Sequence, residues 1–224
     1  MLSPEETIIV LLVLLIFSVV SYKKKSLDFQ GVLVGNILGI SVFLLGGIQA
    51  FSVLVIFFAV AEIATALESR RKGTKTEIRS IQNIIGNGLP ALLCLFLNLP
   101  FAFFGAISAA LADTMSSEIG ILSKKRPLLI TSLKPVKKGT DGGITLQGYL
   151  AALAGALIIS IVFFYFSQNI GKAGILIIAG LGGSTIDSVL GATLERKKIL
   201  NNTSVNFLGS GTGAVIAFAL GLFF

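Results

Sequence analysis

Four acidic residues lie within apolar runs or at their ends, where charged side chains are unusual: Glu62, Asp113, Glu118 and Asp187. An ionisable residue in a membrane segment is costly and usually functional, so each is a candidate site residue. Asp113 and Asp187 occupy similar segments, 112–120 and 182–191. In both, small residues precede the Asp, a hydroxyl residue follows it and a glycine comes later. This similarity indicates a weak internal repeat.

The chemistry open to these acids is limited, because the sequence has no histidine and its single cysteine, Cys94, lies in an apolar run. A Ser-His-Asp triad, a His or Cys zinc site and a disulfide framework are therefore excluded. Carboxylates and hydroxyls at one membrane face instead suit a hard cation such as Mg²⁺. Asp113 and Glu118 are offset by about 140° on an ideal helix, so they share a face only if the backbone is broken or widened. The alternative is that each carboxylate pairs with a Lys or Arg from a neighbouring loop.

A second candidate is segment 134–143, Lys-Pro-Val-Lys-Lys-Gly-Thr-Asp-Gly-Gly, which runs into an apolar stretch. Three lysines and three glycines predict a phosphate cradle, because glycine-rich backbone exposes N–H groups and a helix N-terminus follows. The Gly-Lys-Ser/Thr order of a Walker A loop is absent. A solvated basic turn is the alternative.

A third group is a polar stripe on one predicted helix. Arg79, Asn83 and Asn87 recur every four residues and therefore share a face. They are candidates for ligand binding, with hydrogen bonding between helices as the alternative. Segment 201–206 adds further amides, for which a helix cap is a sufficient explanation.

The elements that must position these residues are membrane helices. Hydrophobic residues make up 54% of the 224 residues and charged residues 13%, against about 25% charged in soluble domains. We expect one integral membrane domain, 1–224, folded as an all-α polytopic bundle with a retained N-terminal helix. The fifth of about eight spans is polar over 112–120, so a broken or re-entrant helix is its alternative. The predicted spans are 5–22, 28–46, 48–67, 79–98, 100–119, 145–167, 172–194 and 205–223.

Eight spans place 17 of the 18 Lys and Arg residues in loops on one side, with only Lys172 opposite. By the positive-inside rule that side is cytoplasmic and both termini are outside. For Lys23–Lys25 and Arg196–Lys198, topology and attraction to anionic headgroups explain the charge without a substrate.

The chain resembles the polytopic membrane family that includes the phytyl-phosphate kinase of tocopherol biosynthesis. The resemblance is carried, in order, by segments 79–88, 112–120, 138–148, 183–193 and 205–207, with Asp-Thr-x-x-Ser-Glu-x-Gly and Gly-Thr-x-Gly-Gly as its specific pair. It implies transfer of a phosphoryl group, with CTP as donor, to an isoprenoid monophosphate such as phytyl or geranylgeranyl monophosphate. The family is distantly similar to dolichol kinases and phosphatidate cytidylyltransferases.

The resemblance and the residue chemistry together imply roles at matching positions. The metal ligands would be Asp113, Glu118 and Asp187, which with Lys138 form the catalytic set. The residues that bind nucleotide or phosphate would be Ser117, Lys137, Gly139, Thr140, Asp141, Gly142 and Gly143. Arg79, Asn83 and Asn87 would meet the second phosphate-bearing partner.

Several functional alternatives stay open from the sequence. A cytidylyltransferase would join CMP to the lipid phosphate, a transporter would use similar broken glycine-rich helices, and a non-catalytic scaffold would need no nucleotide. CTP rests on the resemblance alone, since no segment is recognisable as reading a nucleobase. The expected partners are a lipid phosphate, a nucleotide and membrane lipids, with no nucleic acid, and homo-oligomers are compatible with the sequence.

Overall fold

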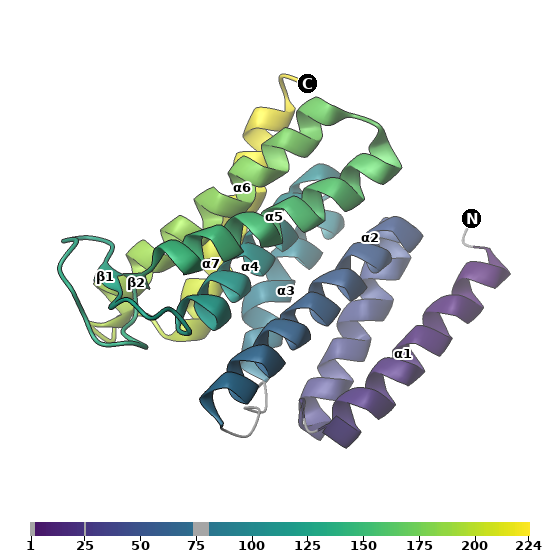
Figure 1. Ribbon diagram of the computed structural model, residues 1–224. Coiled ribbons are helices and arrows are strands. Elements are labelled where there is room, and N and C mark those ends of the chain that lie inside the picture. The colour runs from purple at the N-terminus through teal and green to yellow at the C-terminus, as the bar shows by residue number, and fades with distance from the viewer. Residues whose placement is uncertain (1–2, 25, 74–80) are drawn as a thin grey trace.

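The computed structural model describes residues 3–24, 26–73 and 81–224. It confirms an all-α polytopic membrane fold. Five of the described helical segments, 4–24, 29–72, 146–167, 170–195 and 202–221, are long and apolar enough to cross a membrane. Two short strands interrupt the helices (Figure 1). The described elements are α1 (Pro4–Lys24), α2 (Phe29–Lys72), α3 (Ile81–Phe96), α4 (Pro100–Gly120), β1 (Leu128–Leu129), β2 (Gly143–Ile144), α5 (Leu146–Ser167), α6 (Ile170–Leu190), the π-helical turn η1 (Gly191–Glu195) and α7 (Asn202–Gly221).

Helix α2 is a hairpin of two helical halves. Its 44 residues are interrupted at Gly47, where φ is 70° and ψ is −169°. A Cβ on Gly39 would lie 3.5 Å from the Phe51 ring, although twelve residues of straight helix would separate the two positions by about 18 Å. The chain therefore folds back at Gly47, and the halves coincide closely with the predicted segments 28–46 and 48–67 (Figure 1).

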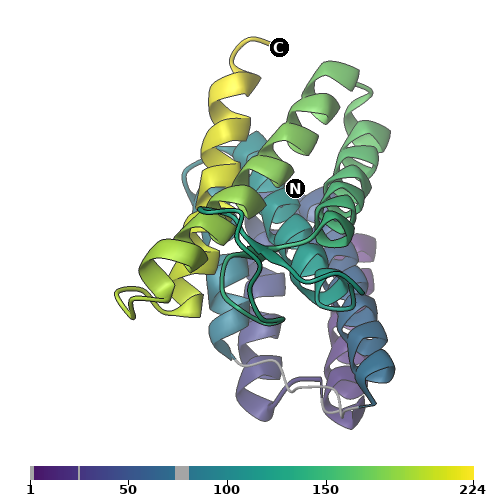
Figure 2. The same ribbon diagram turned by 60° about the vertical axis from the view of Figure 1, so that its left-hand side comes forward.

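The centre of the bundle is α4, which contacts α2, α3, α5, α6 and α7 (Figure 2). Its middle is rich in alanine, and the large side chains of Phe103, Ile107 and Leu111 are fully buried. Small residues let the neighbouring backbones approach, as at Gly105, where a Cβ would lie 2.5 Å from the Gly213 carbonyl oxygen of α7. The Ser108 hydroxyl donates a hydrogen bond to the Leu176 carbonyl of α6 at 2.8 Å.

The break considered for the fifth span is absent, because α4 is continuous from Pro100 to Gly120. Pro100 opens the helix, where its missing N–H costs nothing. The polar residues of segment 113–118 need no break in the helix, since they lie near its end and face polar neighbours there.

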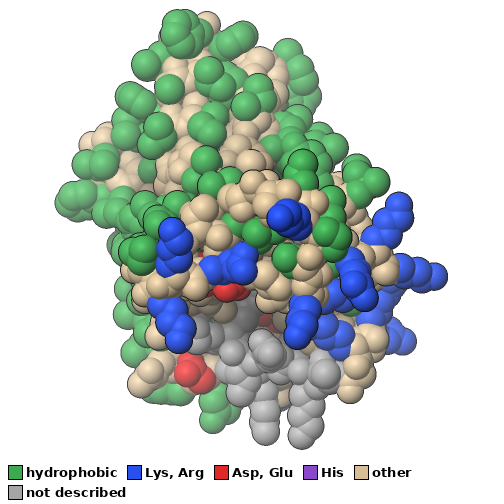
Figure 3. Space-filling model, turned by 90° about the vertical axis from the view of Figure 1, so that its left-hand side faces the viewer, with side chains coloured by type: hydrophobic (Ala, Val, Ile, Leu, Met, Phe, Trp, Pro, Cys, Tyr) green, Lys and Arg blue, Asp and Glu red, His purple; other side chains and the backbone are tan. Residues whose placement is uncertain are grey.

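The two ends of the bundle differ in charge. The end of α4 meets the start of α5, since the Thr145 hydroxyl donates to the Gly120 carbonyl at 3.4 Å. Apart from Lys172, the described Lys and Arg residues belong to the helix ends and connections on this side. Figure 3 shows their side chains spread over it, with hydrophobic side chains covering much of the remaining visible surface. Lys172 lies at the opposite end, 5.6 Å from the ring centre of Phe101.

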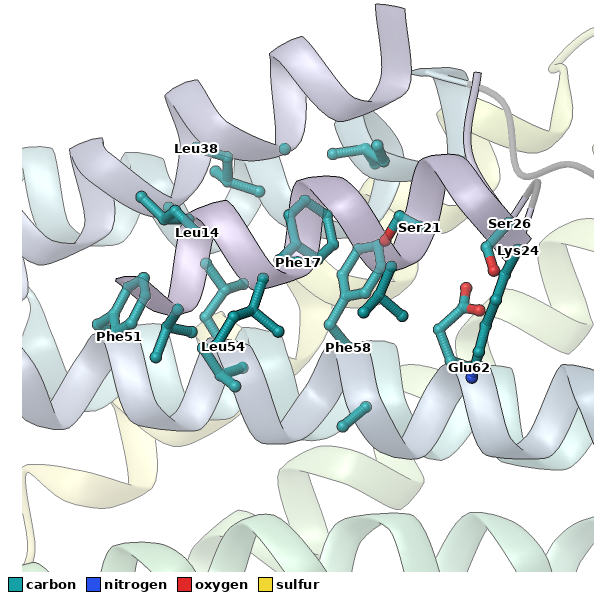
Figure 4. A pocket seen from close by; sticks show the side chains of 18 of the residues that line it. Leu14, Phe17, Ser21, Lys24, Ser26, Leu38, Phe51, Leu54, Phe58 and Glu62 are labelled. Atoms are coloured by element: carbon teal, nitrogen blue, oxygen red, sulfur yellow. The ribbon is translucent and has the colours of Figure 1, made fainter. Parts of the chain in front are cut away.

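Helix α1 lies at the edge of the bundle and packs on the first half of α2 through glycines. A Cβ on Gly35 would lie 3.1 Å from the Phe17 ring. An apolar cavity of about 390 Å³ lies between α1 and α2, with Lys24 and Glu62 side by side at one end (Figure 4). The candidate acid Glu62, a residue of the second half of α2, therefore lies beside the C-terminal end of α1.

Alanine substitutions at Gly213 and Gly211 form a matched pair that tests the central packing. A Cβ at 213 would lie 2.5 Å from the Gly105 carbonyl oxygen, whereas one at 211 would meet nothing within 4 Å. We expect Gly213→Ala to lower the thermal unfolding midpoint in detergent, because overpacking costs about 1–3 kcal/mol. Gly211→Ala should leave the midpoint unchanged or slightly higher. Equal midpoints for the two variants would contradict the close α4–α7 contact.

Candidate functional site

A polar pocket of about 250 Å³ opens at the charged end of the bundle. It lies between the ends of α4 and α6, the start of α7 and the connection between α4 and α5. We call it the acidic pocket. Its lining residues are Asp113, Ser116, Ser117, Gly120, Ile121, Pro127, Lys138, Gly139, Thr140, Asp141, Gly142, Gly143, Thr145, Asp187, Ser188, Gly191, Glu195, Asn202 and Asn206.

Two carboxylates from different helices meet in this pocket. Asp113 of α4 accepts a hydrogen bond from the Ser184 hydroxyl of α6 at 3.4 Å, and its carboxyl group interacts electrostatically with that of Asp187. The Asp187 Oδ2 atom is buried and has no hydrogen-bond partner among the described residues. A buried carboxylate oxygen without a donor beside a second carboxylate is costly unless a cation offsets the charge or the two groups share a proton. The pair therefore fits an oxygen-ligated cation.

The glycine-rich segment forms a tight loop over the carboxylates. Strands β1 and β2 pair antiparallel and close it at its base. Gly139 and Gly142 have φ of 79° and 73°, a region that L side chains rarely adopt. At Gly142 the loop touches the end of α6, since a Cβ there would lie 2.5 Å from the Ala192 nitrogen and 2.6 Å from the Ser188 carbonyl oxygen.

A helix N-terminus faces the same pocket. Thr145, which lines it, caps α5 by accepting a hydrogen bond from the Gly148 N–H at 3.0 Å. Exposed backbone N–H groups and the positive end of a helix dipole both favour an anion such as phosphate.

The charges of the acidic pocket suit a metal-bound anion better than a bare one. Of the residues that the structure describes, four acids, Asp113, Asp141, Asp187 and Glu195, line it together with one cation, Lys138. A free polyphosphate would be repelled by this surplus of negative charge, whereas a divalent cation bound to the phosphates would be attracted.

Most of the predicted site residues come together here. The acidic pocket is lined by Asp113, Ser117, Lys138, Gly139, Thr140, Asp141, Gly142, Gly143 and Asp187. Lys137 is not among the lining residues, but its backbone carbonyl accepts the Thr140 N–H at 3.2 Å and so shapes the turn.

Glu118 is the exception among the predicted metal ligands. Because α4 stays helical to Gly120, the spacing of five residues turns Glu118 away from Asp113. Its carboxylate accepts a hydrogen bond at 2.8 Å from the Thr65 hydroxyl of α2. Among the residues that the structure describes, no three carboxylate or thiol side chains converge as a metal site, so the expected group of three carboxylates reduces here to Asp113 and Asp187.

The polar stripe reaches only the edge of the pocket. The Asn202 side chain, which lines it, donates to Asn83 at 3.5 Å, in agreement with the alternative of hydrogen bonding between helices. Asn87 lies one turn deeper in α3 and does not line the pocket. Arg79 lies outside the described residues.

Several lining residues were not predicted as site residues, notably Glu195, Ser188, Thr145 and Asn206. Glu195 lies eight residues after Asp187, about two helical turns, and this spacing is a detectable signal. Asn202 and Asn206 have the four-residue spacing of one helix face, a pattern overlooked because a cap explained the segment.

The fold and the pocket define a polytopic helical membrane protein with a polar pocket at one end of its bundle. The chain belongs to the integral membrane protein family DUF92, whose sequence model matches residues 12–214. That range contains every residue of the acidic pocket. The family indicated by the sequence motifs is thereby confirmed.

Similar proteins occur in archaea and plants. An uncharacterized membrane protein of Methanocaldococcus jannaschii is 34% identical over 92% of this chain and 90% of its own length. Protein PGR of Arabidopsis thaliana is 31% identical over 78% of this chain and 74% of its own. The chloroplastic protein VTE6 of the same plant is 25% identical over 85% of this chain and 64% of its own. No solved structure matches the chain.

Alanine substitutions at Gly142 and Gly139 test how the loop docks. Both residues have positive φ, so both variants share a conformational cost of about 1 kcal/mol. Only at 142 does a Cβ collide with α6 and η1 atoms, because at 139 the nearest atom lies 3.9 Å away. We expect Gly142→Ala to speed trypsin cleavage after Lys137 and Lys138 well beyond the rate in Gly139→Ala. Equal cleavage rates would show that the loop does not depend on this contact.

Proposed function

We propose that this protein is a membrane lipid-phosphate kinase that transfers a phosphoryl group from a nucleoside triphosphate to an isoprenoid monophosphate. The observation that carries the proposal is the meeting of Asp113 and Asp187 with the Lys138–Gly143 loop in one pocket. Phosphoryl transfer requires little covalent chemistry from the protein, only positioning and neutralisation of charge. These residues supply both.

Asp113 and Asp187 are the residues that would hold Mg²⁺, since an Asp187 oxygen without a hydrogen-bond partner among the described residues, beside a second carboxylate, fits a hard cation. The ion would neutralise charge on the triphosphate and align it for transfer. Lys138 donates to the phosphates as a point charge, while Ser117 and Thr140 offer hydroxyl donors. The backbone of Gly139, Gly142 and Gly143 approaches the phosphates closely because no side chain intervenes.

The reaction balances without a protein base. An oxygen of the acceptor monophosphate attacks the γ-phosphorus and forms a new P–O bond. The bond from that phosphorus to the β,γ-bridging oxygen breaks, and its electron pair leaves with the nucleoside diphosphate. The acceptor phosphate is already ionised at neutral pH, so its attack needs no histidine, in keeping with a sequence that contains none.

The choice of substrates rests on the family resemblance. It supports CTP as donor and a phytyl, geranylgeranyl or similar monophosphate as acceptor. A cytidylyltransferase would use the same pocket but release pyrophosphate, so the mass of the lipid product separates the two. The polar pocket lies at the helix ends rather than at mid-bundle, which favours a transferase over a transporter.

We further propose eight membrane crossings, with each half of α2 crossing once. Under this arrangement the charged end is cytoplasmic and both termini lie outside. The active site would then meet nucleotide in the cytoplasm, while the lipid chain of the acceptor stays in the bilayer.

Asparagine substitutions of the paired acids test the enzyme activity. We expect purified protein with Mg²⁺ and CTP to convert geranylgeranyl monophosphate to the diphosphate. Asp113→Asn and Asp187→Asn should each lower kcat by about 10²-fold or more, as loss of a charge-stabilising group does. Glu5→Gln, at the start of α1, is the matched control and should keep full activity. No transfer to any isoprenoid monophosphate with any nucleotide would refute the kinase.

Cysteine labelling tests the orientation. With Cys94 replaced by Ala, single cysteines are placed at Lys124 and at Lys172. In intact cells we expect a membrane-impermeant maleimide to label the cysteine at 172 and to label the one at 124 only after lysis. The reverse labelling pattern would show that the topology is opposite to the proposed one. Labelling of both cysteines in intact cells would contradict the placement of these residues on opposite sides of the membrane.

A further inference from the structure

A second pocket adjoins the acidic pocket on the side of α2. It measures about 490 Å³ and is lined by Arg71, Lys72, Ile121, Leu122 and Lys138. We call it the basic pocket. Ile121 and Lys138 also line the acidic pocket, so the two pockets are neighbours with Lys138 at their boundary.

The two pockets carry opposite charge. Among the described residues, the acidic pocket has four carboxylates around one lysine, whereas the basic pocket is lined by three cations and by no acid. Lys72 pairs with Glu68 of its own helix. Within the described part of the chain, Arg71 and Lys138 form no ion pair, so two cations remain for an external anion. A metal-bound polyphosphate suits the first pocket and a metal-free phosphate suits the second.

The basic pocket also has an apolar side. Ile121 and Leu122 are half-buried at the end of α4, near the level where apolar helix surface gives way to charged residues. A ligand bound here would contact cations with its anionic head group and apolar side chains with its hydrocarbon chain. That combination fits an amphiphilic phosphomonoester better than a free inorganic ion.

Two local features place the cations of α2. Gly73 ends the helix with φ of 68°, and its N–H bonds to the Ser69 carbonyl, so Arg71 and Lys72 lie in a capped last turn. About two turns earlier, the hydrogen bond from Thr65 to Glu118 ties α2 to α4. Glu118 is therefore a positioning residue, which holds the cationic end of α2 against Ile121.

We infer that the basic pocket is the subsite for the phosphate head of the lipid acceptor, beside a metal–nucleotide triphosphate in the acidic pocket. The inference rests on the proposed function and divides its site in two. Lys138, shared by both pockets, contacts the attacking phosphate and the transferring group. The acceptor oxygen thus approaches the γ-phosphorus from the α2 side.

The test compares two variants that each remove two positive charges. Arg71→Gln with Lys72→Gln changes the basic pocket, whereas Arg196→Gln with Lys197→Gln removes charge from the same end of the bundle but lines neither pocket. In nanodiscs, we expect the first variant to raise KM for geranylgeranyl monophosphate about 10-fold, the effect of losing charge-assisted hydrogen bonds. Its KM for CTP should stay within about 2-fold, and the control variant should change neither.

Direct binding separates this inference from the kinase itself. Equilibrium binding of radiolabelled geranylgeranyl monophosphate without nucleotide should weaken about 10-fold in Arg71→Gln with Lys72→Gln. If that loss occurs although the wild type transfers no phosphate, the subsite stands and the kinase is refuted. If transfer occurs but both variants behave alike, or KM for CTP rises equally, the subsite is refuted.

Inorganic phosphate distinguishes the two sources of the anion. It should compete with geranylgeranyl monophosphate only weakly, since it lacks the stem that meets Ile121 and Leu122. Competition as strong as that of unlabelled lipid monophosphate would assign the pocket to free phosphate and overturn the lipid subsite. Thermal unfolding midpoints equal to wild type should accompany each result, because the substituted side chains are exposed.

Discussion

Close backbone contact between α4 and its neighbours α6 and α7 is the constraint on which the acidic pocket depends. Asp113 and Asp187 belong to different helices, and short carboxylate side chains meet only when those helices nearly touch. Glycines of α6 make this approach feasible: a Cβ on Gly183 would lie 2.4 Å from the Ala109 Cβ of α4, and one on Gly180 would lie 3.3 Å from the Ser108 carbonyl oxygen of α4. Within a membrane such packing, rather than a hydrophobic driving force, holds helices together.

Several features that depend on this packing could be predicted from the sequence. Helix ranges follow from apolar run length, and the two halves of α2 match the separately predicted spans 28–46 and 48–67. Asp113 and Asp187 were predictable as a pair, since an acid near the end of an apolar run must find a partner or a ligand. The glycines of segment 134–143 likewise predicted a loop of exposed backbone followed by a helix N-terminus, and Gly139 and Gly142 do form a turn with positive φ before α5.

The remainder depended on tertiary contacts, which the local spacing of residues does not specify by itself. Whether Glu118 faced Asp113 turned on whether α4 broke near its end, and the polar residues there gave the wrong signal. A carboxylate facing away from the pocket is satisfied by Thr65, which lies 53 residues earlier in the chain. The lining by Asn206 and Glu195 arises from how α7 and η1 close the pocket, which only the packed structure specifies.

The basic residues at this end of the bundle differ in location, because some line a pocket and others do not. If the basic residues served only to orient helices, their placement within the end would be arbitrary. Lys23 and Arg196 fit that account, since neither lines the acidic or the basic pocket. Arg71 and Lys138 do not fit it, because they converge on one cavity from segments far apart in the chain. Under the proposed function, the convergence of these cations, which form no ion pair within the described part of the chain, would offset the mutual repulsion of two adjacent anionic ligands, which any transfer between two phosphates must overcome.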